Sequence, residues 1–285
     1  MEPVLLKNLA ANQERETGMP LVKANGIEIY HETKGSGPKI LFIGGTTGDL
    51  RMRPGPLDWP LTESLEMLAY DQRGQGRSGK PDEPYSMGQY ADDAAALMDA
   101  LGWGPCPVMG FSFGGMVAQE LALRHPGAVT RMVLCSTTSG GQGGASYPIH
   151  ELSGLTPEQW ATRFLELADV RRDQVWRQEH PEQWGLLMEV ATARMRLASQ
   201  DAPARAGLKR QLEARRRHDT YDRLPGTNLP TLVCAGRYDG VAAPAAQEAI
   251  TTAIPGAKFR LFEGGHLFLL EDPAAFGQII EFLRG

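Results

Sequence analysis

The sequence is poor in cysteine and contains no run of apolar residues long enough to span a membrane. Its three cysteines, Cys106, Cys135 and Cys234, each lie in or beside an apolar, strand-like run, and their spacing matches no metal-binding pattern. An odd number of cysteines without such spacing argues against a disulfide framework and against a zinc site. We therefore expect small buried thiols, no bound metal and a location in the reducing cytoplasm.

The chain also lacks an excess of positive charge. It has 285 residues, with 29 Lys and Arg against 34 Asp and Glu and a formal net charge of −5. A nucleic-acid-binding domain carries a basic surface, so we expect no nucleic-acid partner. Residues 1–20 show no basic start followed by a long apolar stretch, so we expect no signal peptide and no association with a membrane.

Strand-like and helix-like apolar patterns alternate along most of the chain. The predicted strands are residues 26–33, 39–43, 64–71, 107–111, 129–137, 229–236 and 257–262, and the predicted helices are residues 86–102, 113–126, 244–254 and 274–285. Such alternation is typical of parallel β-α-β units. The sequence therefore predicts an α/β fold with a mostly parallel sheet and helices on both of its faces.

One stretch interrupts this alternation. Residues 141–224 contain three helix-like patterns and no strand-like one, so we expect a helical cap inserted into a core domain of residues 1–140 and 225–285. The cap is rich in arginine, including residues 215–217. A charge run of this kind is typical of a solvated helix face, and attraction of an anionic substrate is the alternative. We expect its large apolar side chains to form mostly the cap's own core, and these are Trp160, Phe164, Trp176, Trp184 and Met188.

The segment VMGFSFGGM, residues 108–116, places Ser112 between a predicted strand and a predicted helix. It matches the Gly-x-Ser-x-Gly pattern, in which a serine nucleophile occupies a sharp strand-to-helix turn. Gly110 and Gly114 supply the small neighbours that such a turn needs. The same pattern also fits an ordinary glycine-rich turn or phosphate loop, so its meaning depends on the rest of the chain.

A serine hydroxyl is a weak nucleophile and needs a base that is oriented by a third group. Asp239 follows the predicted strand 229–236, and His266 follows the predicted strand 257–262. The carboxyl ends of parallel strands share one edge of the sheet, so both side chains can converge on Ser112. The order Ser, Asp, His is that of α/β-hydrolases and not of the two common serine protease types. We expect these three residues to be catalytic.

The reaction also requires N–H donors for a developing oxyanion. The backbone N–H of Phe113, directly after the nucleophile, is one expected donor. The other usually comes from the loop after an early strand, which here reads FIGGTTGDL. We expect the N–H of Thr46 to be this second donor.

The segments GFSFGGM, YDQRGQGRS, GRYDGVAAP and GGHLFLLEDP together resemble the α/β-hydrolase superfamily over nearly all of the chain outside the insertion. The glycine-rich loop ending in GDL and the cap position resemble 3-oxoadipate enol-lactonase, small esterases and cofactor-free haloperoxidases. The chain has Gly44-Gly45 where many relatives have His-Gly. The resemblance implies serine hydrolase chemistry without a cofactor, and it implies structural roles for Asp71 and Arg73.

We therefore expect a hydrolase that cleaves a small carboxylic ester or lactone through an acyl-enzyme. Alternatives are an amidase similar to proline iminopeptidases, a C–C bond hydrolase, a haloperoxidase or perhydrolase, a lyase or cyclase, or a small-molecule receptor on the same fold. A serine nucleophile argues against haloalkane dehalogenases and epoxide hydrolases, which resemble this chain but use aspartate. The sequence does not determine the substrate or the oligomeric state.

Overall fold

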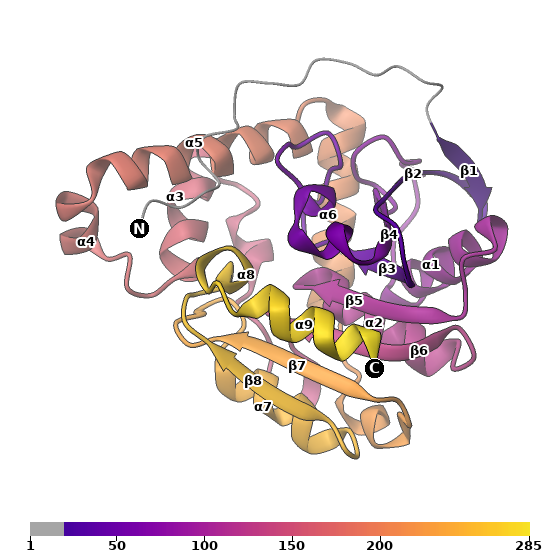
Figure 1. The fold of residues 1–285 in the computed structure, drawn as a ribbon. Helices are drawn as coiled ribbons and strands as arrows, with labels where there is room; N and C mark the ends of the chain where they lie inside the picture. Colours follow the sequence, from indigo (N-terminus) through magenta and orange to yellow (C-terminus); the bar gives the residue numbers. More distant parts are fainter. Residues whose placement is uncertain (1–19) are drawn as a thin grey trace.

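The computed structural model describes residues 20–285 and has an eight-stranded sheet in the order β1-β2-β4-β3-β5-β6-β7-β8 (Figure 1). The pairs from β4 through β3 to β8 are parallel, and β1 and β2 pair antiparallel at one edge. The strands are β1 (Leu21–Ala24), β2 (Ile27–Lys34), β3 (Lys39–Ile43), β4 (Glu66–Tyr70), β5 (Cys106–Phe111), β6 (Val129–Cys135), β7 (Thr231–Gly236) and β8 (Lys258–Phe262). The predicted mostly parallel α/β fold is confirmed.

Alternate residues of the strands face opposite sides of the sheet and build two cores. In β3, Leu41 and Ile43 join one core and Ile40 and Phe42 join the other. The first core lies under α1 (Met87–Leu101), α2 (Phe113–Arg124) and α7 (Pro244–Ala253). The second lies under α9 (Ala275–Arg284), which crosses the opposite face together with the short α8 (Phe268–Glu271) (Figure 1). A strand buried on both faces explains the continuous apolar run of residues 39–43.

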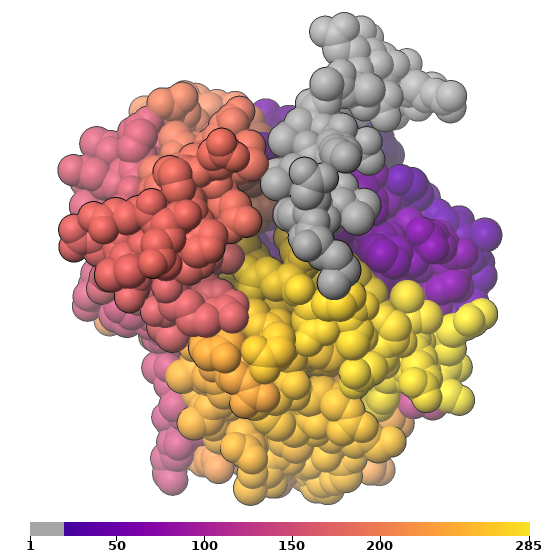
Figure 2. Space-filling model, turned by 60° about the vertical axis from the view of Figure 1, so that its left-hand side comes forward, coloured from indigo at the N-terminus to yellow at the C-terminus, as the bar shows by residue number. Residues whose placement is uncertain are grey.

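Between β6 and β7 the chain forms helices only, apart from loops and short 3₁₀ turns. The α-helices are α3 (Pro157–Ala168), α4 (Gln174–Glu179), α5 (Pro181–Ala198) and α6 (Ala202–Arg216). Helix α3 begins at a capping box, in which the Thr156 hydroxyl and the Gln159 side chain each bond the other residue's N–H. In Figure 2 the surface of these helices adjoins the yellow C-terminal segment, and the Arg172–Glu271 ion pair joins the two.

The structure differs from the sequence-based expectation in three local ways, and one of them is the short helix α8, whose residues were expected to belong to a loop. Strand β1 was not predicted, since its four residues at the sheet edge alternate too briefly to give a pattern. Helix α4 was also missed, because its six residues contribute no fully buried side chain. The segment in which no signal peptide is expected, residues 1–19, lies outside the described residues. Among residues 20–285, no helix combines the length and apolar character needed to cross a membrane.

Candidate active site

Ser112 occupies the turn between β5 and α2 in a backbone conformation that L-residues rarely adopt, with φ 54° and ψ −116°. Its N–H donates a 2.8 Å hydrogen bond to the carbonyl of Cys135 at the end of the neighbouring strand β6. Gly110 and Gly114 pack so closely that a Cβ on Gly110 would overlap the Gly114 carbonyl, and a Cβ on Gly114 would overlap the carbonyl of Ile43. The glycines of the motif therefore make this turn sterically possible.

The structure brings Ser112, His266 and Asp239 together in one hydrogen-bonded chain. His266 Nε2 lies 2.9 Å from Ser112 Oγ, and His266 Nδ1 lies 2.8 Å from Asp239 Oδ2. All three residues are buried. A carboxylate only accepts hydrogen bonds, so Asp239 fixes the proton on Nδ1 and leaves the Nε2 lone pair facing the serine hydroxyl. This arrangement can remove a proton from Ser112.

The carboxylate of Asp239 is itself held in place by the backbone. Its Oδ1 accepts hydrogen bonds from the N–H groups of Val241 and Ala242, each at 2.8 Å. The other oxygen, Oδ2, is therefore the one that faces His266. Two donors on one oxygen fix the rotamer of this side chain.

The C-terminal end of α3 connects the two loops that carry the acid and the base. The carbonyl of Ala168 accepts from the N–H of His266 at 2.5 Å, and the carbonyl of Leu167 accepts from the N–H of Gly240 at 2.9 Å. A third bond, of 3.0 Å, runs from the N–H of Val170 to the carbonyl of Tyr238. The insertion thus fixes the backbone on both sides of the Asp239–His266 contact.

The loop after β3 runs beside the nucleophile. A Cβ built on Gly45 would lie 3.4 Å from the Ser112 Cβ, so Thr46 follows a residue in direct contact with the turn. Among the described residues, neither the Thr46 N–H nor the Phe113 N–H has a hydrogen-bond acceptor, which leaves both available to a ligand. The Gln72 amide holds the loop by donating to the Gly44 carbonyl at 2.8 Å.

Two aromatic rings pack against the imidazole of His266. Phe111 of β5 lies 5.4 Å from it between ring centroids, and Phe164 of α3 lies 6.1 Å from it in an edge-to-face arrangement. Phe164 also stacks on Trp160 at 4.8 Å. Trp160 belongs to the core within the insertion, as expected, whereas Phe164 extends that core to the base. The rings shield His266 from water and limit its rotation.

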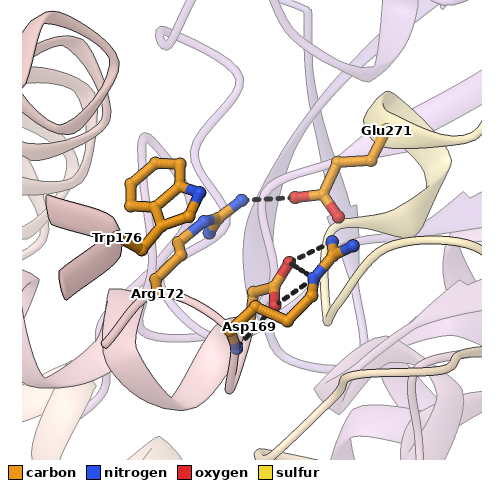
Figure 3. A pocket seen from close by; sticks show the side chains of 5 residues that line it. Asp169, Arg172, Trp176 and Glu271 are labelled. Carbon is orange, nitrogen blue, oxygen red and sulfur yellow. Dashed lines mark hydrogen bonds and ion pairs between the residues drawn. The ribbon is translucent and has the colours of Figure 1, made fainter. Parts of the chain in front are cut away.

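The cavity of about 270 Å³ that Figure 3 shows adjoins the loop that carries His266, because its lining residues Asp169 and Glu271 lie against Gly265. Its charged groups are paired with each other: Arg172 donates to Glu271 at 2.5 Å, and Arg171 donates to both carboxylate oxygens of Asp169. Glu271 also accepts from the N–H of Gly265 at 2.7 Å, one residue before His266. These ion pairs brace the loop that carries the base.

Asp71 and Arg73 lie behind the site and hold loops in place. Asp71 accepts from the N–H groups of Leu50 and Arg77, at 2.7 and 2.8 Å, and burial raises its pKa to about 6. Arg73 forms a buried bidentate pair with Asp93. Both contacts fit the structural interpretation of these residues.

Sequence reasoning missed several polar residues around the site. Ser136, which has φ 51°, donates from its hydroxyl to the His266 carbonyl at 2.8 Å. Gln72, Gln211 and Arg215 contact the loop after β3. Gln72 and Ser136 closely follow strands β4 and β6, so their positions at the carboxyl edge of the sheet were a usable signal. No comparable signal marks Gln211 on α6, whereas Arg215 belongs to the arginine run of residues 215–217 that is visible in the sequence.

A parallel sheet with a serine turn at its carboxyl edge and an insertion after β6 defines the class of α/β-fold hydrolases. The family model described as "alpha/beta hydrolase fold" matches residues 38–273, and the chain belongs to this family. The chain is thus a hydrolase of the α/β type, as the resemblance implies.

Curated relatives and solved structures match almost the whole chain. A protein of Azorhizobium caulinodans named "Putative carbamate hydrolase RutD" is 25% identical over 92% of this chain and 97% of its own length. The 3-oxoadipate enol-lactonase 2 of Acinetobacter baylyi is 26% identical over 90% of this chain and 93% of its own. The crystal structure of an enol-lactonase from Burkholderia xenovorans LB400 aligns with a TM-score of 0.77 and 25% identity, covering 93% of this chain and all of that one.

Proposed function

We propose that this hydrolase cleaves a small carboxylic ester or lactone through an acyl-enzyme on Ser112. The observation that carries the proposal is the unbroken chain from Asp239 through His266 to Ser112, with contacts of 2.8 and 2.9 Å at the carboxyl edge of the sheet. The names of the enol-lactonase relatives are consistent with a lactone or ester substrate.

In the first half-reaction, Ser112 Oγ bonds to the carbonyl carbon while its proton passes to His266 Nε2. Asp239 stabilises the resulting imidazolium, and the N–H groups of Thr46 and Phe113 hold the negative carbonyl oxygen. The tetrahedral intermediate formed in this way collapses and breaks the bond to the alcohol oxygen, which takes the proton from His266. Water then adds to the acyl carbon as His266 removes its proton, and the acid leaves with Ser112 restored. No cofactor takes part in these steps.

We assign residues 141–224 as the cap over this site and residues 1–140 and 225–285 as the catalytic core. The backbone contacts of α3 support this division, because they join the insertion to the loops that carry the proposed acid and base. The proposal includes a small-molecule substrate, action in the cytoplasm and no nucleic-acid partner.

A fluorophosphonate probe, which labels activated serines, tests the central assignment. We expect stoichiometric labelling of Ser112 in the native chain and none in Ser112→Ala. A panel of esters, lactones and aminoacyl amides then compares the bond types under the same conditions, with Ser112→Ala as the blank. Equal labelling of the two proteins, or turnover that survives in Ser112→Ala, contradicts the proposal.

A further inference from the structure

Three consecutive arginines end helix α6, and the structure gives them different surroundings. Arg216 and Arg217 are exposed, and both pair with the carboxylate of Glu213. Arg215 is buried, with 7% of its surface exposed, and it has no carboxylate partner among residues 20–285. The other two buried arginines in this range, Arg73 and Arg172, each have one.

The guanidinium of Arg215 lies between the cap and the proposed oxyanion loop. One of its terminal nitrogens donates to Ser146 Oγ at 2.7 Å, and the other lies 3.5 Å from Thr46 Oγ1. Burial lowers its pKa to about 10, and the attraction of the Asp239 carboxylate opposes this shift. The group remains a cation at neutral pH, because it still titrates well above 7.

A second donor lies one turn earlier on the same face of α6. Gln211 is fully buried, and its Oε1 accepts from the N–H of Thr47 at 3.3 Å. Its Nε2 has no hydrogen-bond acceptor among the described residues. A buried amide nitrogen without an acceptor is unfavourable, as is a buried cation without an anion. Both groups, the Arg215 guanidinium and the Gln211 side-chain amide, lie beside the loop of residues 46–47.

A cavity of about 120 Å³ opens onto Arg215. Ser146 and His218 line it from the insertion, and Met116 lines it from the first turn of α2, which begins directly after Ser112. The cavity therefore lies between the arginine and the helix that starts at the nucleophile. Its volume suits a small acid group with a few attached carbons.

We infer that Arg215 and Gln211 form a binding site for a carboxylate on the substrate, so that the enzyme selects esters or lactones that carry a second, free acid group. A carboxylate beside the loop of residues 46–47 accepts from the guanidinium and from the unused Gln211 N–H, and it supplies the missing counter-charge. The ester carbonyl then lies toward Ser112. This inference rests on the proposed hydrolase function and adds the substrate class to it.

Selectivity between matched esters tests the inference. The p-nitrophenyl monoesters of glutaric and adipic acid carry the free carboxylate, and their methyl p-nitrophenyl diesters are the neutral partners. We expect the native enzyme to favour the anionic member by about ten- to hundredfold in kcat/KM, since a hydrogen bond to a charged group contributes that much. Rates with Ser112→Ala are subtracted as the uncatalysed background.

Variants of neighbouring arginines distinguish binding from folding. Arg215→Gln should bring the ratio of anionic to neutral kcat/KM close to one, and Arg215→Lys should retain part of it. Arg217→Gln is the matched control, because this exposed arginine pairs with Glu213 and does not line the cavity, and it should keep the native ratio. A native ratio near one, or an unchanged ratio in Arg215→Gln, overturns the inference. If Arg215→Gln does not fold, the native ratio and the partial loss in Arg215→Lys decide the outcome.

Glutarate binding, measured by calorimetry on the native enzyme and on Arg215→Lys, needs no turnover. Binding that weakens at least tenfold in Arg215→Lys supports the site, and equal binding in both overturns it. If the fluorophosphonate does not label Ser112 in the native chain, that result refutes the proposed hydrolase function and not the carboxylate site. The two failures are therefore separable.

Discussion

Replacement of Asp239 by asparagine is the sharpest test of how the site works. In the native structure Oδ1 accepts two backbone N–H bonds from Val241 and Ala242, and Oδ2 faces His266 Nδ1. The side-chain amide in Asp239→Asn has only one acceptor oxygen, and the two backbone donors retain it. Its NH₂ group must then face Nδ1, which can only accept a hydrogen bond if its proton moves to Nε2. The histidine thus presents an N–H, and not a lone pair, to Ser112.

With the proton on Nε2, His266 can no longer act as the general base, although all three side chains remain in place. We expect kcat/KM on an activated ester to fall by about 10⁴-fold, as the same change does in the serine protease triad. That factor corresponds to about 5 kcal/mol of transition-state stabilisation. The variant should fold normally, because an amide replaces a carboxylate of the same shape, and thermal unfolding serves as the control.

Steady-state kinetics measure the loss of activity, and ¹⁵N chemical shifts of His266 report which ring nitrogen carries the proton. The shifts should report the proton on Nδ1 in the native enzyme and on Nε2 in Asp239→Asn. A loss of activity below tenfold, or a proton that stays on Nδ1 in the variant, would refute the proposed orientation of the base by Asp239.

Three further predictions concern the backbone and the supporting charges. Gly265→Ala should reduce kcat/KM by at least about a hundredfold through a lower kcat, with KM unchanged. The added Cβ overlaps the Ala168 carbonyl, which holds the backbone N–H of His266. Wild-type kinetics in this variant would contradict the prediction. Ser112→Gly should have a free energy of unfolding about 1 kcal/mol higher than that of Ser112→Ala in urea, since glycine relieves the positive φ; a less stable glycine variant would refute the strain. Asp71→Asn should lower the free energy of unfolding by about 2 kcal/mol at pH 8. The amide has only one acceptor oxygen for the N–H groups of Leu50 and Arg77, so one of these donors then faces the amide NH₂. Because the pKa of Asp71 is raised to about 6 in the folded protein, the stability that this residue contributes is largest at low pH and falls as the pH rises through 6. The free energy of unfolding lost in Asp71→Asn should therefore be about 1 kcal/mol greater at pH 5 than at pH 8. A loss that does not change with pH would contradict this prediction.

Local signals made most of the fold predictable. Helix α1 (Met87–Leu101) is capped by Ser86 and Gly102 in the structure, as the sequence indicates, because caps act within one turn of the chain. The positions of Ser112, Asp239 and His266 were also predictable, since the parallel sheet brings the carboxyl ends of β5, β7 and β8 to one edge. Their catalytic role stays a prediction until it is measured.

The polar surroundings of the site were not predictable, because they depend on how the insertion rotates onto the core. Residues 215–217 form one charge run in the sequence, and the structure gives its members different surroundings. The solvated helix face applies to Arg216 and Arg217, and burial singles out Arg215. Side chains on successive residues of a helix point about 100° apart, so only the packing of α6 could separate them.

In the proposed carboxylate site, helix α6 links recognition of a substrate acid group to the proposed oxyanion loop. Gln211 holds the N–H of Thr47, and Arg215 lies against the Thr46 side chain, so both residues contact the segment whose N–H is proposed to receive the oxyanion. A carboxylate that binds these two side chains also restrains that segment. Binding energy from a part of the substrate that does not react is then available to position a donor that acts in the transition state. On this argument, loss of the substrate carboxylate should lower kcat as well as raise KM.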